Sequence, residues 1–160
     1  MITGALAASY YGVPRTTMDV DVIVRVSRRS MLSNLISALK VARLIVNEKR
    51  LDSVFNSKFR IATLRDRDTP FTLDIIFSSR KLNKRAGSIS GLPTFYQTPE
   101  DLILAKLRMV KATIPKDRAL KDMDDIRAIL KFSKVKIGVI KREARKDSTL
   151  HILEDLIANV

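Results

Sequence analysis

The spacing of apolar residues changes at about residue 98 of this 160-residue chain. Before that point, apolar and polar residues alternate as in half-buried strands over residues 19–26, 58–65 and 71–78. After it, apolar residues recur at helical spacing over residues 98–113, 117–132 and 149–158. Strands followed by helices predict an α+β or layered α/β fold, with a small mixed sheet flanked by helices and a helical C-terminal part.

We therefore expect an α/β core over residues 1–97 and a helical part over residues 98–160, packed on the core as one compact unit. The second and third strands should form an antiparallel pair, because only the charged turn of residues 66–70 separates them. The remaining core elements are expected to be a helix over residues 5–11, a helix from an N-cap at Ser27 to about Asn47, and a strand over residues 92–97.

Two further segments are less regular. The stretch "GSISG" at residues 87–91 is bracketed by glycines but lacks the lysine of a P-loop, so we expect a flexible loop. Residues 135–146 fit either a strand or a helix.

Composition excludes several classes of site. The chain has no cysteine and one histidine, His151, which rules out disulfides, zinc ribbons, thiol nucleophiles and His-rich metal sites. Any metal must therefore be held by oxygen. The sequence also has no apolar run long enough to span a membrane and no signal-peptide pattern, so we expect a soluble, cytoplasmic protein with no membrane partner.

The charge balance favours a polyanionic partner. The chain carries 30 basic and 17 acidic residues, and residues 1–90 alone carry 16 basic and 7 acidic residues. Excess lysine and arginine bind phosphates with release of counterions, so nucleic acid is the favoured partner, with solvated surface charge as the alternative. The cluster of Arg80, Lys81, Lys84 and Arg85 fits either an RNA-steering surface or a solvated turn.

Asp19 and Asp21 start the first strand and lie two positions apart in "MDVDVIV". Side chains at this spacing share one face of a strand, about 6–7 Å apart, so a divalent cation such as Mg²⁺ would relieve their repulsion. Asp74 lies between apolar residues in "FTLDIIF", where a buried charge without a partner is costly. Three convergent carboxylates are typical of two-metal phosphoryl-transfer sites. Taken alone, the first pair also fits exposed aspartates at a strand start.

The stretch "ITGALAASYYGVPRTTMDVDVIV" resembles the signature of the nucleotidyltransferase superfamily that includes DNA polymerase β. Gly4 and Ala5 take the first two places, and thirteen residues separate Ala5 from Asp19. The helices at "TPEDLILAKL" and "RALKDMDDI" are similar to those of AbiEii-type toxins and other small prokaryotic nucleotidyltransferases. The resemblance covers about residues 2–130.

This resemblance implies a nucleotidyltransferase fold and transfer of a nucleoside monophosphate from an NTP to an acceptor hydroxyl, with two Mg²⁺ ions, or Mn²⁺, as cofactors. It implies the catalytic and metal-binding residues Asp19, Asp21 and Asp74. The implied nucleotide-binding residues are Gly4, Ala5, Arg15, Thr17 and Lys106, supported by Asp122 and Asp125. The family usually has glycine or serine where this chain has Ala5, so the residue departs from the pattern. Family members also usually have a helix and a longer strand ahead of the glycine, whereas only three residues precede Gly4, so we expect either a natural start upstream or a sheet trimmed at that edge.

Physical chemistry also gives a reason for most of the implied nucleotide contacts. Gly4 would let the backbone approach phosphates closely. Lys106 lies on the apolar stripe of its helix and points inward, either to a triphosphate or to a structural ion pair with Asp122. Arg15 fits a phosphate clamp or a loop-anchoring salt bridge, and Asp125 is expected at a solvated rim.

The biological role is open at this stage. RNA, including tRNA, is the leading acceptor, with a protein hydroxyl or a small molecule as the runner-up. The resemblance also suggests a toxin–antitoxin pair with an antitoxin protein as partner. Two other classes fit the sequence: a nucleic-acid-binding module that kept the fold without catalysis, and a partner-regulated protein.

Overall fold

The computed structural model describes residues 1–158, which divide into two compact units. The first unit comprises residues 1–6 and 16–96, and the second comprises residues 7–15 and the chain from residue 97 onward. The sequence placed residues 7–15 in the core, whereas they belong to the helical unit.

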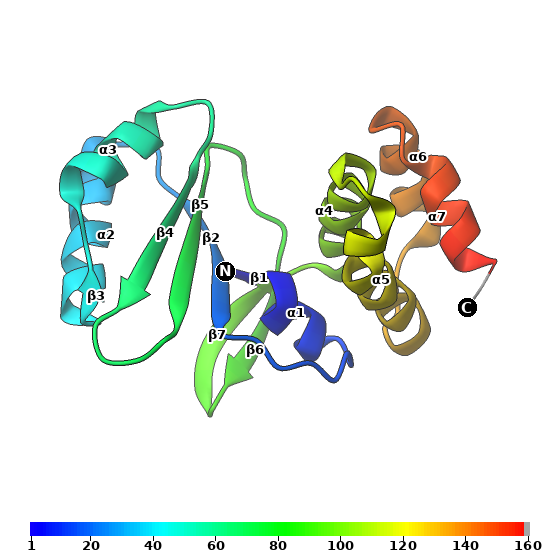
Figure 1. The fold of residues 1–160 in the computed structure, drawn as a ribbon, viewed down its shortest axis with the longest axis horizontal. Helices are drawn as coiled ribbons and strands as arrows, with labels where there is room; N and C mark the ends of the chain where they lie inside the picture. Colours follow the sequence, from blue (N-terminus) through cyan, green and yellow to red (C-terminus); the bar gives the residue numbers. More distant parts are fainter. Residues whose placement is uncertain (159–160) are drawn as a thin grey trace. The chain divides into compact units, whose positions relative to one another are not determined.

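The first unit is built on a mixed sheet of seven strands (Figure 1). Their bounds are β1 (Ile2–Thr3), β2 (Asp19–Arg25), β3 (Leu44–Ile45), β4 (Ile61–Asp66), β5 (Thr72–Ser78), β6 (Lys84–Ile89) and β7 (Leu92–Gln97). The strand order is β3-β4-β5-β2-β1-β7-β6. β2 runs parallel to β5, and β4 runs antiparallel to β5, as the hairpin prediction required. The mixed α/β architecture agrees with the expected fold class.

Two helices, α2 (Arg29–Val41) and α3 (Glu48–Asn56), cover one face of β2, β5 and β4 (Figure 1). Every second residue of the strands faces these helices, and this face supplies the apolar core of the unit. Its buried members are Val26, Leu32, Leu39, Leu51, Ala62, Leu64, Ile75 and Phe77. The alternate residues of the same strands therefore lie on the other face of the sheet.

The helix expected from Ser27 to Asn47 was too long. The N-cap position of α2 is Arg28 instead of Ser27, without a side-chain capping hydrogen bond. The helix ends at Val41, and β3 follows it. Arg43 adopts a left-handed backbone with φ of 61°, which ends helical geometry without a glycine. α3 was not expected from the sequence; Asn47 caps it by accepting a hydrogen bond from the Arg50 N–H at 3.0 Å.

The expected loop at residues 87–91 was also wrong, because Gly87, Ser88 and Ile89 belong to β6. Ser90 and Gly91 form a two-residue turn to β7, with φ values of 49° and 78°. Positive φ at both turn residues is typical of the type I′ turn that joins neighbouring strands. β1 is only two residues long, but it lies between β2 and β7 and is therefore not an edge strand.

The second unit is helical. The bounds of its main elements are α4 (Pro99–Ala112), a 3₁₀ turn (Lys116–Ala119), α5 (Leu120–Phe132), α6 (Ile137–Lys146) and α7 (Leu150–Ile157). Thr98 caps α4 by accepting from the Asp101 N–H, as expected. Residues 135–146, which fitted either type of element, contain α6. No helix within residues 1–158 is both long and apolar enough to cross a membrane.

Residues 7–15 are tied to these helices by specific contacts. They follow the boundary between the two units, which falls within α1 (Gly4–Tyr10). The Tyr11 hydroxyl donates to the Gln97 carbonyl at 2.6 Å, and the Ser133 hydroxyl donates to the Tyr11 carbonyl at 3.2 Å. These bonds explain why a segment so early in the chain belongs with helices from its second half.

Candidate active site

The carboxylates predicted from the sequence lie on the sheet face opposite α2 and α3. In the parallel pairing of β2 and β5, Asp21 is opposite Asp74, and Asp19 is opposite Thr72. On the other side of β5, Thr63 of β4 is opposite Asp74. Since side chains two residues apart share a face, Asp19, Asp21 and Asp74 all project from this side of the sheet. Neither threonine was predicted, because identifying them requires the strand register.

Gly4 lies directly against the Asp21 side chain. It has a φ of 62°, and a Cβ atom placed on it would lie 2.0 Å from Asp21 Oδ2. Thr3, the preceding residue, is opposite Asp21 in the pairing of β1 with β2. Only glycine has both the backbone freedom and the space that this contact requires. Gly4 therefore fixes where the Asp21 carboxylate can lie, and Ala5 beside it is buried at 8% exposure.

Asp74 has an oxygen that lacks a partner. Its Oδ1 atom is buried and accepts no hydrogen bond within residues 1–158. A buried carboxylate oxygen in this state costs free energy, because it has lost its hydration without gaining a donor. Such an atom fits a site whose missing partner is a cation or a hydroxyl of a ligand.

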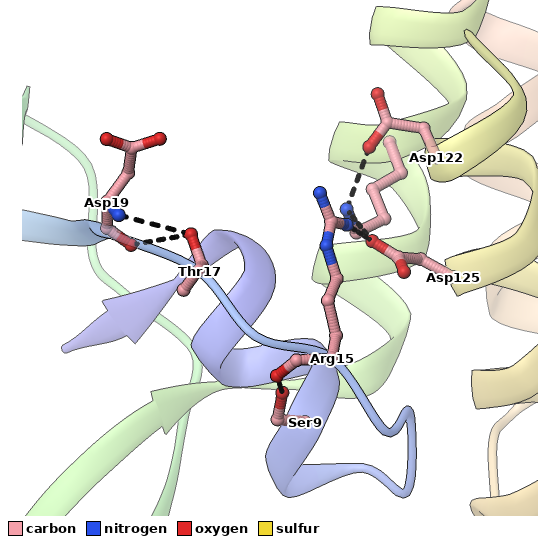
Figure 2. Close-up of polar contacts among 7 residues, drawn as sticks. Ser9, Arg15, Thr17, Asp19, Asp122 and Asp125 are labelled. Carbon is pink, nitrogen blue, oxygen red and sulfur yellow. Dashed lines mark hydrogen bonds and ion pairs between the residues drawn. The ribbon is translucent and has the colours of Figure 1, made fainter.

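The side chain and the backbone of Asp19 form hydrogen bonds with two threonines. Its Oδ1 atom accepts from the Thr72 hydroxyl across the strand pair. The Thr17 hydroxyl accepts from the Asp19 N–H at 3.1 Å and contacts the Asp19 carbonyl at 3.2 Å (Figure 2). Within residues 1–158, no three acidic or histidine side chains are arranged to hold one metal ion. Coordination of a metal by all three aspartates therefore stays a prediction.

The remaining predicted residues form a separate ion network in the second unit (Figure 2). The Lys106 ammonium lies 2.8 Å from Asp122 Oδ1 and 2.7 Å from Asp125 Oδ2. The Arg15 guanidinium donates to the same oxygen of Asp125, and the Ser9 hydroxyl donates to the Arg15 carbonyl at 3.3 Å. Two cations and two carboxylates thus balance each other.

Burial separates the members of this network. The Lys106 and Asp125 side chains are 8% and 4% exposed, whereas Asp122 is 27% exposed. The expectation that Asp125 lies at a solvated rim was therefore wrong; the exposed aspartate of this helix is Asp124, which pairs with Arg127. Asp125 faces inward because Lys106 and Arg15 compensate its charge. Carboxylates pair with both Arg15 and Lys106 in this structure. Contacts of these two cations with a nucleotide therefore stay predictions.

Over most of its length, the fold of this chain is similar to that of a solved structure. It is the crystal structure of an antigenic nucleotidyltransferase-like protein from Paracoccidioides brasiliensis, with a TM-score of 0.58 and 16% sequence identity. The match covers 94% of this chain and 83% of that chain. This chain has a nucleotidyltransferase-like fold. No protein-family model matches the sequence, and no curated protein is significantly similar to it.

Proposed function

We propose that this nucleotidyltransferase-like chain is an enzyme that transfers a nucleoside monophosphate from an NTP to an acceptor hydroxyl: the hydroxyl oxygen bonds to the α-phosphorus, the α–β phosphoanhydride bond breaks, and pyrophosphate leaves. The observation that carries the proposal is the unpartnered Oδ1 of Asp74, which lies in register with Asp21 on one sheet face. Retaining such an arrangement costs stability, so it indicates a site for a ligand. The likeness in fold supports the same class of reaction.

The site residues have distinct proposed roles. Asp19, Asp21 and Asp74 provide only oxygen donors, the type of ligand that Mg²⁺ prefers over nitrogen or sulfur. Bound Mg²⁺, with Mn²⁺ as a substitute, would stabilise the negative charge on the transferred phosphoryl group. Asp74 Oδ1 accepts the proton of the acceptor hydroxyl, and Gly4 keeps Asp21 in place while leaving its own backbone open to the NTP phosphates.

RNA, including tRNA, is the proposed acceptor. The first 90 residues carry 16 basic and 7 acidic side chains, which favours a polyanion over a protein hydroxyl or a small molecule. The motif resemblance to AbiEii-type toxins adds the proposal that the enzyme acts as a toxin with an antitoxin protein as its partner. The proposed location is the cytoplasm, where NTPs and RNA are both present.

Label transfer tests the reaction directly. The protein is incubated with each α-labelled NTP, Mg²⁺ and total RNA, and labelled RNA is resolved on a denaturing gel. Wild type should label RNA, whereas Asp21→Asn and Asp74→Asn should not. Asp124→Asn is the matched control, because it removes an exposed carboxylate from the second unit. Equal labelling by wild type and the Asp74 variant would contradict the proposal.

A non-catalytic nucleic-acid-binding or partner-regulated protein with the same fold is the alternative. The hydrogen bond from Thr72 to Asp19 favours it, because this carboxylate is already engaged. The alternative predicts no transfer with any NTP or metal, together with RNA binding that weakens steeply with salt. It also predicts that the Asp21 and Asp74 variants bind RNA as tightly as wild type.

A further inference from the structure

Three segments of the first unit meet at one edge of the sheet. β2 and β5 are parallel, with their last residues, Arg25 and Ser78, in register. β4 runs the other way and begins beside them, since the Phe77 N–H donates to the Arg60 carbonyl at 2.8 Å. The segments of residues 25–29, 58–60 and 78–81 therefore lie along the same edge (Figure 1).

This edge is strongly basic. The three segments contain seven basic residues and no acidic residue. Arg29 pairs with Asp52, but the other six basic residues form no ion pair within residues 1–158. We call these six the basic edge: Arg25, Arg28, Lys58, Arg60, Arg80 and Lys81. Unpaired cations at this density favour a ligand with several phosphates, because each contact releases a counterion.

Apolar groups accompany these charges. Phe59, within the same edge, is 88% exposed. On the sheet face that carries Asp21 and Asp74, the next cross-strand row is Ile23, Ile76 and Ile61, of which Ile61 is 57% exposed.

The rows also have an order along the face. From Asp21, the isoleucine row is about 7 Å along β2 and Arg25 is about 13 Å along it. A strand that ends at the carboxylates would thus place a base or sugar on the isoleucines before its phosphates reach the basic edge. A duplex hides its base faces and cannot use the isoleucines or Phe59 in this way.

We propose that the basic edge, together with Phe59 and the isoleucine row, binds the single-stranded 3′ segment of a polynucleotide acceptor. The acceptor role rests on the proposed function, in which the terminal hydroxyl meets Asp74. An acidic peptide would satisfy the cations but would not need Phe59, so the charge and the apolar groups together favour a single strand.

The test is fluorescence anisotropy with a short 5′-labelled single-stranded RNA, without NTP, over a range of salt concentrations. The double variant Arg25→Ala/Arg80→Ala should weaken binding about tenfold and reduce the salt slope by about 1.4, or about 0.7 for each phosphate contact. Phe59→Ser should weaken binding at least fivefold, as expected for the loss of about one stacked base. The control is Arg67→Ala, which removes an exposed arginine from the opposite end of β4 and β5 and should change little.

Several results would overturn the proposal that this surface binds a single strand. These are unchanged binding by the edge variants, an equal loss in the control, tighter binding of duplex than of single strand, or equal competition by polyglutamate. Label transfer measured in parallel separates the two proposals. If wild type transfers label and the edge variants transfer it equally well, the proposed binding surface is refuted but the proposed reaction is not. Edge-dependent RNA binding without any transfer would refute the reaction and support the surface.

Discussion

The two units of this protein differ in whether cations compensate the charge of their aspartates. In the second unit, Asp122 and Asp125 are balanced by Lys106 and Arg15. In the first unit, Asp74 forms no ion pair within residues 1–158, and its Oδ1 atom is buried and accepts no hydrogen bond. The Asp125 side chain and the Oδ1 atom of Asp74 are both buried, but cations compensate only Asp125.

This difference separates a structural role from a functional one. A compensated ion network holds elements together, and losing one member leaves the others unpaired. An uncompensated carboxylate lowers stability and persists where a ligand supplies the missing partner. Substitutions in the first unit should therefore reduce activity, whereas substitutions in the second should reduce stability.

The largest effect is expected from Asp74→Asn in the first unit. The amide keeps the shape of the side chain but cannot accept the acceptor's proton or hold a cation as well, so label transfer should fall about 10³-fold, or about 4 kcal/mol. The free energy of unfolding should stay within about 0.5 kcal/mol of wild type or rise, because no ion pair is lost. Single-turnover transfer and urea denaturation measure the two quantities. A large loss of stability would show that Asp74 has a structural role and would remove the contrast.

The second-largest effect is expected from Asp125→Ala in the second unit. This change leaves the buried Lys106 with only Asp122 and leaves Arg15 without its carboxylate, so the free energy of unfolding should fall by about 3–5 kcal/mol. Asp122→Ala is the matched control and should cost less, because its side chain is 27% exposed and contacts one cation. If urea denaturation shows the same loss of unfolding free energy for Asp122→Ala and Asp125→Ala, burial does not decide the role of these residues.

Sequence reasoning was most successful where a single element carries its own pattern. The alternation in β2, β4 and β5 and the cap of α4 at Thr98 are local, so these elements could be predicted. The end of α2 could not, because the apolar spacing continues through Leu44 and Ile45 while Arg43, with its left-handed backbone, interrupts the helix. β6 was missed for a similar reason, since glycine and serine are poor strand formers that pairing with β7 overrides.

The candidate site shows the same limit. Sequence identified the three aspartates but not their register, which places Thr72 beside Asp19 and Thr63 beside Asp74. Burial of Asp125 depends on Arg15, which is 110 positions away in the chain. A helix contains no information about a partner that distant, so a prediction from spacing alone left Asp125 at a rim.

A third, intermediate effect is expected from Gly4→Ala. The added methyl would lie 2.0 Å from Asp21 Oδ2, and φ of 62° disfavours any side chain, so Asp21 must move. Label transfer should fall at least tenfold, and the free energy of unfolding should fall by about 1–3 kcal/mol. Gly91→Ala is the control, because it has φ of 78° with no atom within 4 Å of the new methyl. That variant should lose about 1 kcal/mol of stability from backbone strain and keep full transfer.

The smallest effect concerns Asp66, an exposed carboxylate at the end of β4 that hydrogen bonds satisfy in place of cations. Its Oδ1 accepts from the Asp68 N–H and the Thr69 N–H, each at 2.8 Å, and from the Thr69 hydroxyl at 3.0 Å. The Asp68 N–H is the main cause that lowers the pKa of Asp66 below its usual value, followed by the Thr69 hydroxyl. Because the folded-state pKa is the lower one, this stabilisation is complete above the ordinary carboxyl pKa of about 4 and is lost as the pH falls through the folded-state value.

Asp66→Asn should therefore be slightly less stable than wild type at neutral pH, and the difference should shrink as the pH falls from about 5 toward 2. Urea denaturation at several pH values measures this trend. Asp68→Asn provides the comparison, because it removes a carboxylate from the same turn but leaves the Asp68 N–H that donates to Asp66. A difference that grows in acid would show that Asp66 opposes folding, as an uncompensated carboxylate does, and would place it with Asp74 instead of with the satisfied aspartates.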